Sequence, residues 1–334
     1  MKHKSIVYLL VIMLIIGLSL GCSGKEAPKE APKEAPKDKI VTLNFPTATT
    51  TGTIYPLGAA MANMWNTMLP NVKVTAQASN GGVHNLNLMR EGNAQISFIT
   101  TGIGWEALNG TATFKDRPYK DLRIIAGLYY NPNQLVVREA ANIKTIADLK
   151  GKNFAPGASG STPEVETRLL LTEAGFKYPD DIKPHFVGFT EAIDLMRNKQ
   201  IDGAMIMAGI PTAAVTEMTA TAGGRLLSID ENLRQALKAK YPWYADFVIP
   251  AGTYENQKED VNTLAIKMVL IADAKVSEDI IYNLTKLFWE NLDVIRPAHK
   301  IVNQMKLEAA VTDLSGIPLH PGAEKYYKEK GLLK

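Results

Sequence analysis

The sequence contains one cysteine, Cys22, in 334 residues. No disulfide can therefore form within the chain, and a zinc site built from several cysteines is excluded. The five histidines do not indicate a zinc site either, because they lie far apart in the sequence and none belongs to an HExxH motif. We therefore expect neither a metal centre nor another bound cofactor.

Sequence signatures of catalysis are also missing. The stretch GKNFAPGASGST at residues 151–162 lacks the Gly-Lys-Ser/Thr of a nucleotide-binding P-loop, and no GxGxxG follows the first expected strand. Ser159 lies in GASGS, which is not the GxSxG turn that carries a catalytic serine. We therefore predict that the protein is not an enzyme.

The chain has no marked excess of basic residues, with 37 lysines and arginines against 34 acidic residues. Two of those lysines lie in residues 1–21, so the rest of the chain is nearly neutral. Nucleic-acid binding needs a clustered basic surface, and this balance gives no support for one.

Long apolar runs are limited to Ile6–Leu18, which follows Lys2 and Lys4. The run is short for a membrane-spanning helix, so we interpret residues 1–21 as a signal peptide. Cys22 follows a small residue and resembles the lipobox cysteine, which is lipidated and becomes the mature N-terminus, although Ser19 stands where leucine is usual. This predicts an extracytoplasmic protein anchored to the cell membrane; the alternative is simple cleavage nearby that leaves a free thiol.

Residues 22–38 are dominated by three copies of EAPK at 26–37. A proline-rich, alternately charged tract has nothing to bury, so we expect an extended linker of roughly 3 Å per residue. The remaining span is long enough for two domains.

Strands that pass through small polar loops into helices recur along the chain. Three such loops are TATTTG at 47–52, SNGG at 79–82 and TTG at 100–102. Alternating strands and helices predict a parallel sheet with helices on both faces, whose ligands bind beyond the carboxyl ends of the strands. The three loops should therefore meet at one edge.

The second half of the chain repeats this plan. At residues 153–171, Thr162 suits a helix N-cap and Pro163 the first helical position, while the glycines and serines before them leave backbone N–H groups open to an anion. An ordinary, well-capped turn is the alternative. Ile201–Met207 then runs into the small residues of 208–212.

Other elements are expected from apolar periodicity. The expected strands include Leu122–Leu128, Gln134–Val137, Asp181–Val187, Phe247–Tyr254 and Leu264–Ala272. The expected helices include one capped by Thr190, Ile280–Leu292, Arg296–Met305 and one from about Pro321. We expect the chain to cross between two lobes near Asn131 and again near Pro250. One lobe then comprises residues 39–131 and 250–334, and the other comprises residues 132–249. The two lobes can close about a hinge.

Motifs in both lobes resemble the TAXI family of TRAP-transporter substrate-binding proteins. They are TGTIYPLGAA (51–60), SNGGVHNL (79–86), PGASGSTPEVETRLL (156–170), IDGAMIMAGIPTAAV (201–215), IPAGTY (249–254) and PLHPGAEKYY (318–327). The resemblance covers about residues 40–330. It implies a type II periplasmic-binding-protein fold, that is, an α/β protein with two lobes, each a mostly parallel sheet flanked by helices, joined by two hinge strands.

The resemblance also implies a function. Such proteins capture a small organic anion outside the membrane and deliver it to a sodium-driven permease with fused small and large subunits, and relatives bind glutamate or related carboxylates. We expect a monomer with a glutamate-like amino acid or organic acid as its ligand. The alternative is a receptor of the same fold that serves an ABC importer or a sensor.

Ligand-binding positions are carried over from the family to twelve residues: Gly52, Thr53, Tyr55, Asn80, Gly81, Ser159, Gly160, Ser161, Thr162, Gly209, Pro211 and Thr212. Further candidates are Thr101, His84 and Tyr130, with exposure on a helix the alternative for His84 and packing between the lobes the alternative for Tyr130. The family often has glycine at position 80, serine at 82 and an acid near 84, so the ligand can differ. Because no arginine stands in the polar loops, neutral donors and helix dipoles must hold the carboxylate.

Overall fold

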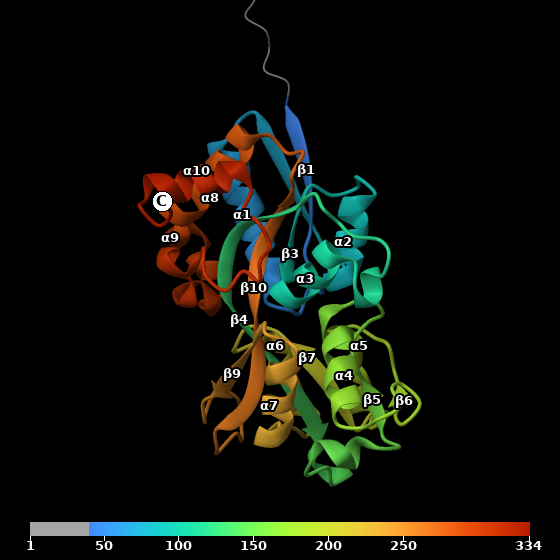
Figure 1. The fold of residues 1–334 in the computed structure, drawn as a ribbon. Helices are drawn as coiled ribbons and strands as arrows, with labels where there is room; N and C mark the ends of the chain where they lie inside the picture. Colours follow the sequence, from blue (N-terminus) through green and yellow to red (C-terminus); the bar gives the residue numbers. More distant parts are fainter. Residues whose placement is uncertain (1–39) are drawn as a thin grey trace, which may run out of the picture. The chain divides into compact units, whose positions relative to one another are not determined.

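The computed structural model describes residues 40–334. The expected signal peptide, the linker and the lipidation site Cys22 lie outside the described residues. Within 40–334, two long strands organise the fold: β4 (Leu122–Arg138) and β10 (Val261–Asp273). They pair antiparallel from Ala265 opposite Pro132 to Asp273 opposite Leu122. Both strands run through two lobes (Figure 1).

Lobe 1 combines the beginning and the end of the described chain. Its strands are β1 (Val41–Pro46), β2 (Val72–Gln77) and β3 (Ile96–Thr100), and its helices are α1 (Ile54–Met68), α2 (Gly82–Arg90), α3 (Thr101–Asn109), α8 (Glu278–Glu290), α9 (Leu292–Ile295) and α10 (Pro321–Glu329). The short helices η1 (Ala112–Phe114), η4 (Arg296–Ala298), η5 (Lys300–Gln304) and η6 (Leu307–Ala309) belong to it as well. Helices α8 and α9 thus pack beside α1 although more than 200 residues separate them from it in sequence.

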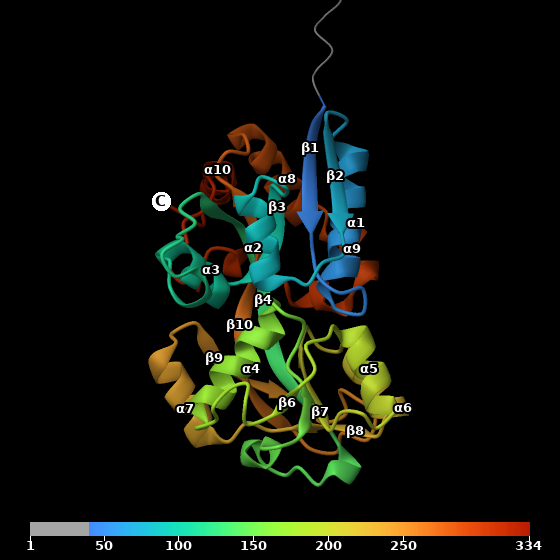
Figure 2. The same ribbon diagram turned by 90° about the vertical axis from the view of Figure 1, so that its right-hand side faces the viewer.

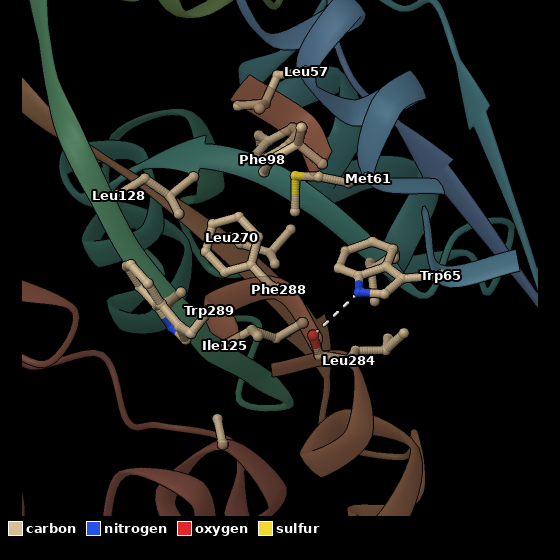
Figure 3. Close-up of a cluster of buried hydrophobic side chains, with 14 of the residues drawn as sticks. Leu57, Met61, Trp65, Phe98, Ile125, Leu128, Leu270, Leu284, Phe288 and Trp289 are labelled. Carbon is tan, nitrogen blue, oxygen red and sulfur yellow. Dashed lines mark hydrogen bonds between the residues drawn. The ribbon is translucent and has the colours of Figure 1, made fainter. Parts of the chain in front are cut away.

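Apolar side chains from these elements form the core of lobe 1 (Figure 3). Trp65 of α1 is fully buried, and its Nε1 donates a hydrogen bond of 3.1 Å to the carbonyl oxygen of Leu284 in α8. Phe98 of β3 and Phe288 of α8 are buried in the same cluster. Trp289 of α8 is buried as well.

Lobe 2 contains the middle of the chain. Its strands are β5 (Asn153–Ala155), β6 (Lys183–Pro184), β7 (Gly203–Met207), β8 (Gly224–Leu227) and β9 (Tyr244–Ile249), and its helices are α4 (Thr162–Glu173), α5 (Phe189–Arg197), α6 (Ala213–Thr221) and α7 (Glu231–Lys240). The short helices η2 (Glu139–Ala141) and η3 (Ile146–Leu149) follow β4. Figure 2 shows α4 beside the boundary with lobe 1.

The larger sheet is mixed rather than mostly parallel, whereas β1 and β2 form a separate parallel sheet. Within residues 40–334, one sheet runs β3-β10-β4-β7-β5-β6, with β8 added to β4 and β9 to β10. Only the pairs β1–β2, β5–β6 and β5–β7 are parallel. A strand that runs from one lobe into the other is directed towards the lobe boundary in the first lobe and away from it in the second. Hence β10 opposes β3 in lobe 1, and β4 opposes β7 in lobe 2.

Several expected boundaries are wrong. Strand β4 is continuous through residues 129–132, because Asn131 and Pro132 pair with β10. The strand expected over Asp181–Val187 contracts to Lys183–Pro184, and the helix expected over Arg296–Met305 consists of 3₁₀ turns around Pro297. The strand expected to end at Tyr254 ends at Ile249.

Two helix starts also shift. The N-cap of α4 is Ser161 and not Thr162, because the Ser161 hydroxyl accepts the N–H of Glu164 at 3.3 Å. The N-cap of α5 is Gly188 and not Thr190. In both cases the true cap lies one or two residues earlier than the expected one.

The segment after residue 250 packs with lobe 2. Tyr254 and Val261 pack into an apolar cluster with lobe 2 residues such as Ile206 and Val215. We therefore propose that the chain returns to lobe 1 within β10.

None of the helices in residues 40–334 is long and apolar enough to cross a membrane.

Candidate functional site

A cavity of about 50 Å³ lies between the two lobes. Its wall draws on both lobes and on the hinge strands: Ala48, Thr49, Gly52, Thr53, Ile54, Asn80, Gly81, Gly82, Phe98, Ile99, Tyr129, Asn131, Ala158, Ser161, Thr162, Pro163, Gly188, Phe189, Met207, Ala208 and Met268. The loops that follow β1, β2 and β5 contribute most of the polar positions. They meet here because the carboxyl ends of those strands point towards the lobe boundary.

The amino ends of four helices in the described chain reach this wall. The N-cap residues of α1, α2, α4 and α5 line it: Thr53, Gly81, Ser161 and Gly188. Among these four described caps, only Ser161 makes a side-chain capping hydrogen bond. The first N–H groups of a helix and the positive end of its dipole attract an anion. The wall is therefore electropositive without a basic side chain.

The lobes touch around the cavity. The N–H of His84 in α2 donates to the carbonyl oxygen of Gly160 at 3.1 Å, and Thr53 Oγ1 donates to the carbonyl oxygen of Gly209 at 3.2 Å. Gly82 approaches so closely that a Cβ added there would lie 2.7 Å from the backbone nitrogen of Thr162. The structure therefore presents the lobes in a closed arrangement.

Polar atoms of three wall residues are left without partners in the described chain. The Tyr129 hydroxyl, Asn131 Oδ1 and Thr49 Oγ1 are buried and make no hydrogen bond within residues 40–334. Tyr129 and Asn131 are two residues apart on β4, so both face the same side of the sheet. Burial raises the pKa of Tyr129 well above its ordinary value, which keeps its hydroxyl protonated. Unpartnered buried polar atoms in native proteins mark places where a ligand or water completes the bonding.

No aspartate, glutamate, lysine, arginine or histidine is among the residues that line this cavity in the described chain. Apolar side chains cover much of the wall, including Phe98, Ile99 and Phe189. The recognition chemistry available is thus helix dipoles, backbone N–H groups and neutral side chains.

Six of the twelve ligand-binding residues expected from the sequence line the cavity: Gly52, Thr53, Asn80, Gly81, Ser161 and Thr162. The other six do not. Gly209 lies just behind the wall, where its carbonyl oxygen accepts from Thr53, and Gly160 accepts from His84 at the lobe contact. Ser159 is exposed, Tyr55 and Pro211 are half-buried, and Thr212 is buried as the N-cap of α6.

The three further candidates lie off the wall too. His84 Nδ1 accepts the N–H of Asn80 at 3.3 Å, so this histidine supports the loop before α2. Thr101 is buried at the first position of α3. Tyr130 points to the opposite face of β4, where its hydroxyl donates to Asp313 at 3.0 Å beside a separate hollow that Trp105 also lines.

Several wall residues lie outside the polar loops and were not predicted from the sequence. Asn131 and Met268 lie inside long hinge strands, and Phe189 and Met207 come from lobe 2. Alternation along β4 would have paired Tyr129 with Asn131 had the strand been predicted as continuous.

A pair of buried carboxyl groups lies near the same boundary. Glu166 of α4 accepts hydrogen bonds from Tyr244 at 2.7 Å and Asn133 at 3.2 Å. Glu106 of α3 is 4% exposed, and its Oε2 has no partner within residues 40–334. Burial raises the pKa of each to about 7, and the charge of Glu106 adds to the shift of Glu166. The two groups therefore interact across the lobe boundary.

The NMT1-like family model matches residues 45–331 of this chain. Among solved structures, a protein from Bordetella bronchiseptica RB50 is 17% identical with a TM-score of 0.53, and the match covers 88% of this chain and 90% of that chain. The alkanesulfonate-binding protein SsuA from Xanthomonas axonopodis pv. citri bound to MOPS is 14% identical, with a TM-score of 0.47 and coverage of 87% and 84%.

A putative L-cystine ABC transporter protein from Listeria monocytogenes is 12% identical, with a TM-score of 0.48 and coverage of 78% of this chain and 94% of that chain. The α/β architecture, with two lobes and a mixed main sheet flanked by helices, confirms the expected fold class. The correction is that the main sheet is mixed rather than mostly parallel.

Proposed function

The chain belongs to the NMT1-like family, and we propose on this basis that it is an extracytoplasmic solute-binding protein that captures a small carboxylate and delivers it to a membrane permease. The observation that carries the proposal is the meeting of four helix amino ends of the described chain at one cavity between the lobes. The interaction with one helix amino end stabilises a bound anion by about 0.3–1 kcal/mol at an exposed site and by up to about 2 kcal/mol at a partly buried one.

The hinge geometry supports capture and release. Two strands, β4 and β10, connect the lobes, and the contacts between Thr53 and Gly209 and between His84 and Gly160 close the cavity. Ligands that bridge two lobes bind the closed form better and shift the population towards it. A permease can distinguish the closed form from the open form by this difference in shape.

A TRAP-type permease with fused small and large subunits is the proposed partner, and this finer assignment rests on the resemblance to the TAXI family. Reconstituted vesicles test it. Uptake of the bound acid should follow a sodium gradient and should need both the permease and this protein. Uptake that requires ATP instead would assign the protein to an ABC importer.

Carboxylate binding can be tested without the permease. A panel of sodium salts of organic acids, with alkylammonium chlorides as the cationic control, should raise the melting temperature only in the acid arm. Calorimetry should then give a dissociation constant of about micromolar or tighter for the best acid. A panel in which cations stabilise the protein as well as acids do would contradict the proposal.

Lipid anchoring at Cys22 is proposed from the sequence alone. Cys22→Ser should move the protein from the membrane fraction to the soluble fraction while leaving ligand binding unchanged. Retention of the variant in the membrane fraction would show that another segment holds it there.

A further inference from the structure

We propose that the ligand of this cavity is a small monocarboxylic acid with an uncharged, mainly apolar body that carries a hydroxyl group. This inference rests on the proposed function and narrows it. It excludes dicarboxylates and amino acids such as glutamate, which the family resemblance suggested. The argument uses the charge of the wall, its unpartnered polar atoms and its size.

The charge of the wall admits one anionic group. Four helix amino ends in the described chain can hold one carboxylate, but no basic side chain lines the cavity to neutralise a second. A second carboxylate would be buried without a counter-charge, which is a costly arrangement. Glutarate and glutamate each carry such a group.

An ammonium group fits no better. The wall carries no aspartate or glutamate among the described residues, and the buried carboxyl groups of Glu106 and Glu166 do not line it. The same helix ends that attract a carboxylate repel a cation. An α-amino acid would therefore bury its ammonium group without an ionised partner.

The unpartnered atoms on β4 call for a hydroxyl group. Asn131 is 3% exposed and Tyr129 is 4% exposed, and neither Asn131 Oδ1 nor the Tyr129 hydroxyl has a partner in the described chain. An amide oxygen only accepts hydrogen bonds, so Asn131 needs a donor, whereas a tyrosine hydroxyl both donates and accepts. A ligand hydroxyl can donate to Asn131 and accept from Tyr129.

The remaining wall residues favour an apolar body, and the cavity volume limits the size of the ligand. Phe98, Phe189, Met207 and Met268 supply an apolar surface. A cavity needs about 10–15 Å³ to hold one water molecule, so a cavity of about 50 Å³ has room for about four waters, which occupy about 120 Å³ in the liquid. That space limits the ligand to a small acid of a few carbons.

Acids with the same five-carbon chain separate these contributions. We would measure, by calorimetry on the full-length protein, pentanoate, 2-hydroxypentanoate, 4-hydroxypentanoate, 2-aminopentanoate, glutarate and glutamate. The better hydroxypentanoate should bind at least tenfold more tightly than pentanoate and at least thirtyfold more tightly than glutarate, glutamate and 2-aminopentanoate.

The failures of the two proposals are distinguishable. If glutarate or glutamate binds most tightly, this inference is wrong and carboxylate capture stands. If pentanoate binds as well as both hydroxypentanoates, the hydroxyl assignment is wrong. If no acid in the series binds or raises the melting temperature, the proposed carboxylate function falls with it.

Variants on β4 test the hydroxyl contact directly. Tyr129→Phe and Asn131→Ala should each reduce the preference for hydroxypentanoate over pentanoate to less than about threefold. Tyr130→Phe is the matched control, because its hydroxyl lies on the opposite face of β4 and should leave the preference unchanged. A preference that survives in both Tyr129→Phe and Asn131→Ala would overturn the proposal.

Discussion

Replacing Gly82 by alanine should hold the lobes apart and weaken ligand binding. A Cβ at this position would lie 2.7 Å from the backbone nitrogen of Thr162 and 2.8 Å from its Oγ1, across the lobe boundary. Ordinary contact begins at 3.4 Å, so the lobes must part by several tenths of an ångström there. The nearby bond from His84 to Gly160, 3.1 Å long, would stretch beyond hydrogen-bonding range if it moved equally.

The expected loss follows from that bond. One backbone hydrogen bond contributes about 0.5–1.5 kcal/mol, and the loosened contacts around it add a similar amount. A penalty of about 1–3 kcal/mol on the closed form alone weakens the apparent affinity by roughly 5- to 160-fold. Calorimetry with the tightest-binding acid of the five-carbon series measures this loss, and small-angle X-ray scattering reports whether the lobes close on ligand addition.

Backbone strain must be separated from the contact between lobes. Gly82 has φ of 47°, so alanine is strained there in the open and the closed form alike, and this strain lowers stability but cancels in the affinity. Gly92, at the other end of α2, has φ of 78° and no atom within 4 Å of an added Cβ. Gly92→Ala should therefore lose a similar stability of about 1 kcal/mol and keep its affinity. Equal affinity losses in both variants, or no loss in Gly82→Ala, would refute the reasoning.

Three further predictions concern stability. Glu106 and Glu166 have pKa values near 7 in the folded protein against the ordinary 4.5, so the folded state binds more protons than the unfolded state between these values. Their contribution to stability is complete below about pH 4.5 and is lost as the pH rises through 7, by roughly 3 kcal/mol per group at most. Melting curves from pH 5 to 8 should show this fall, and Glu166→Gln should make it shallower; an unchanged slope would exclude this carboxyl group as the source. Ser161→Ala removes the cap of α4 and should lower the free energy of unfolding by about 1 kcal/mol in a urea titration, whereas the exposed Ser159→Ala should change it little. Trp65→Ala should cost about 3–5 kcal/mol, because the side chain is fully buried and its Nε1 bond to α8 is lost; a loss below about 1 kcal/mol in the same titration would contradict its place in the core.

Local chemistry along the chain is enough to predict most elements. The cap of α4 illustrates this, since a serine, a proline and a glutamate within four residues identify a helix start to within one position. The strand that precedes it and the small residues between them are equally local. The order of strands, polar turns and helices, and therefore the two-lobed α/β class, follow from such short-range patterns.

Contacts between distant residues required the tertiary structure. Strand β4 is continuous because residues 129–132 pair with β10, more than 130 positions away, and no local signal reports that pairing. The same pairing puts Tyr129 and Asn131 on the cavity wall and directs Tyr130 to the other face.

The absence of charge on the wall has the same origin. Sequence patterns identified polar loops at strand ends, and six of the twelve residues expected to bind the ligand line the cavity. Which side chains are excluded from the wall depends on how two lobes close, and that is set by contacts such as His84 with Gly160 and by the close approach of Gly82 to Thr162. Short-range propensities therefore determine the elements and their order, while long-range packing decides which atoms face the ligand, because a pocket is assembled from segments that share no local sequence.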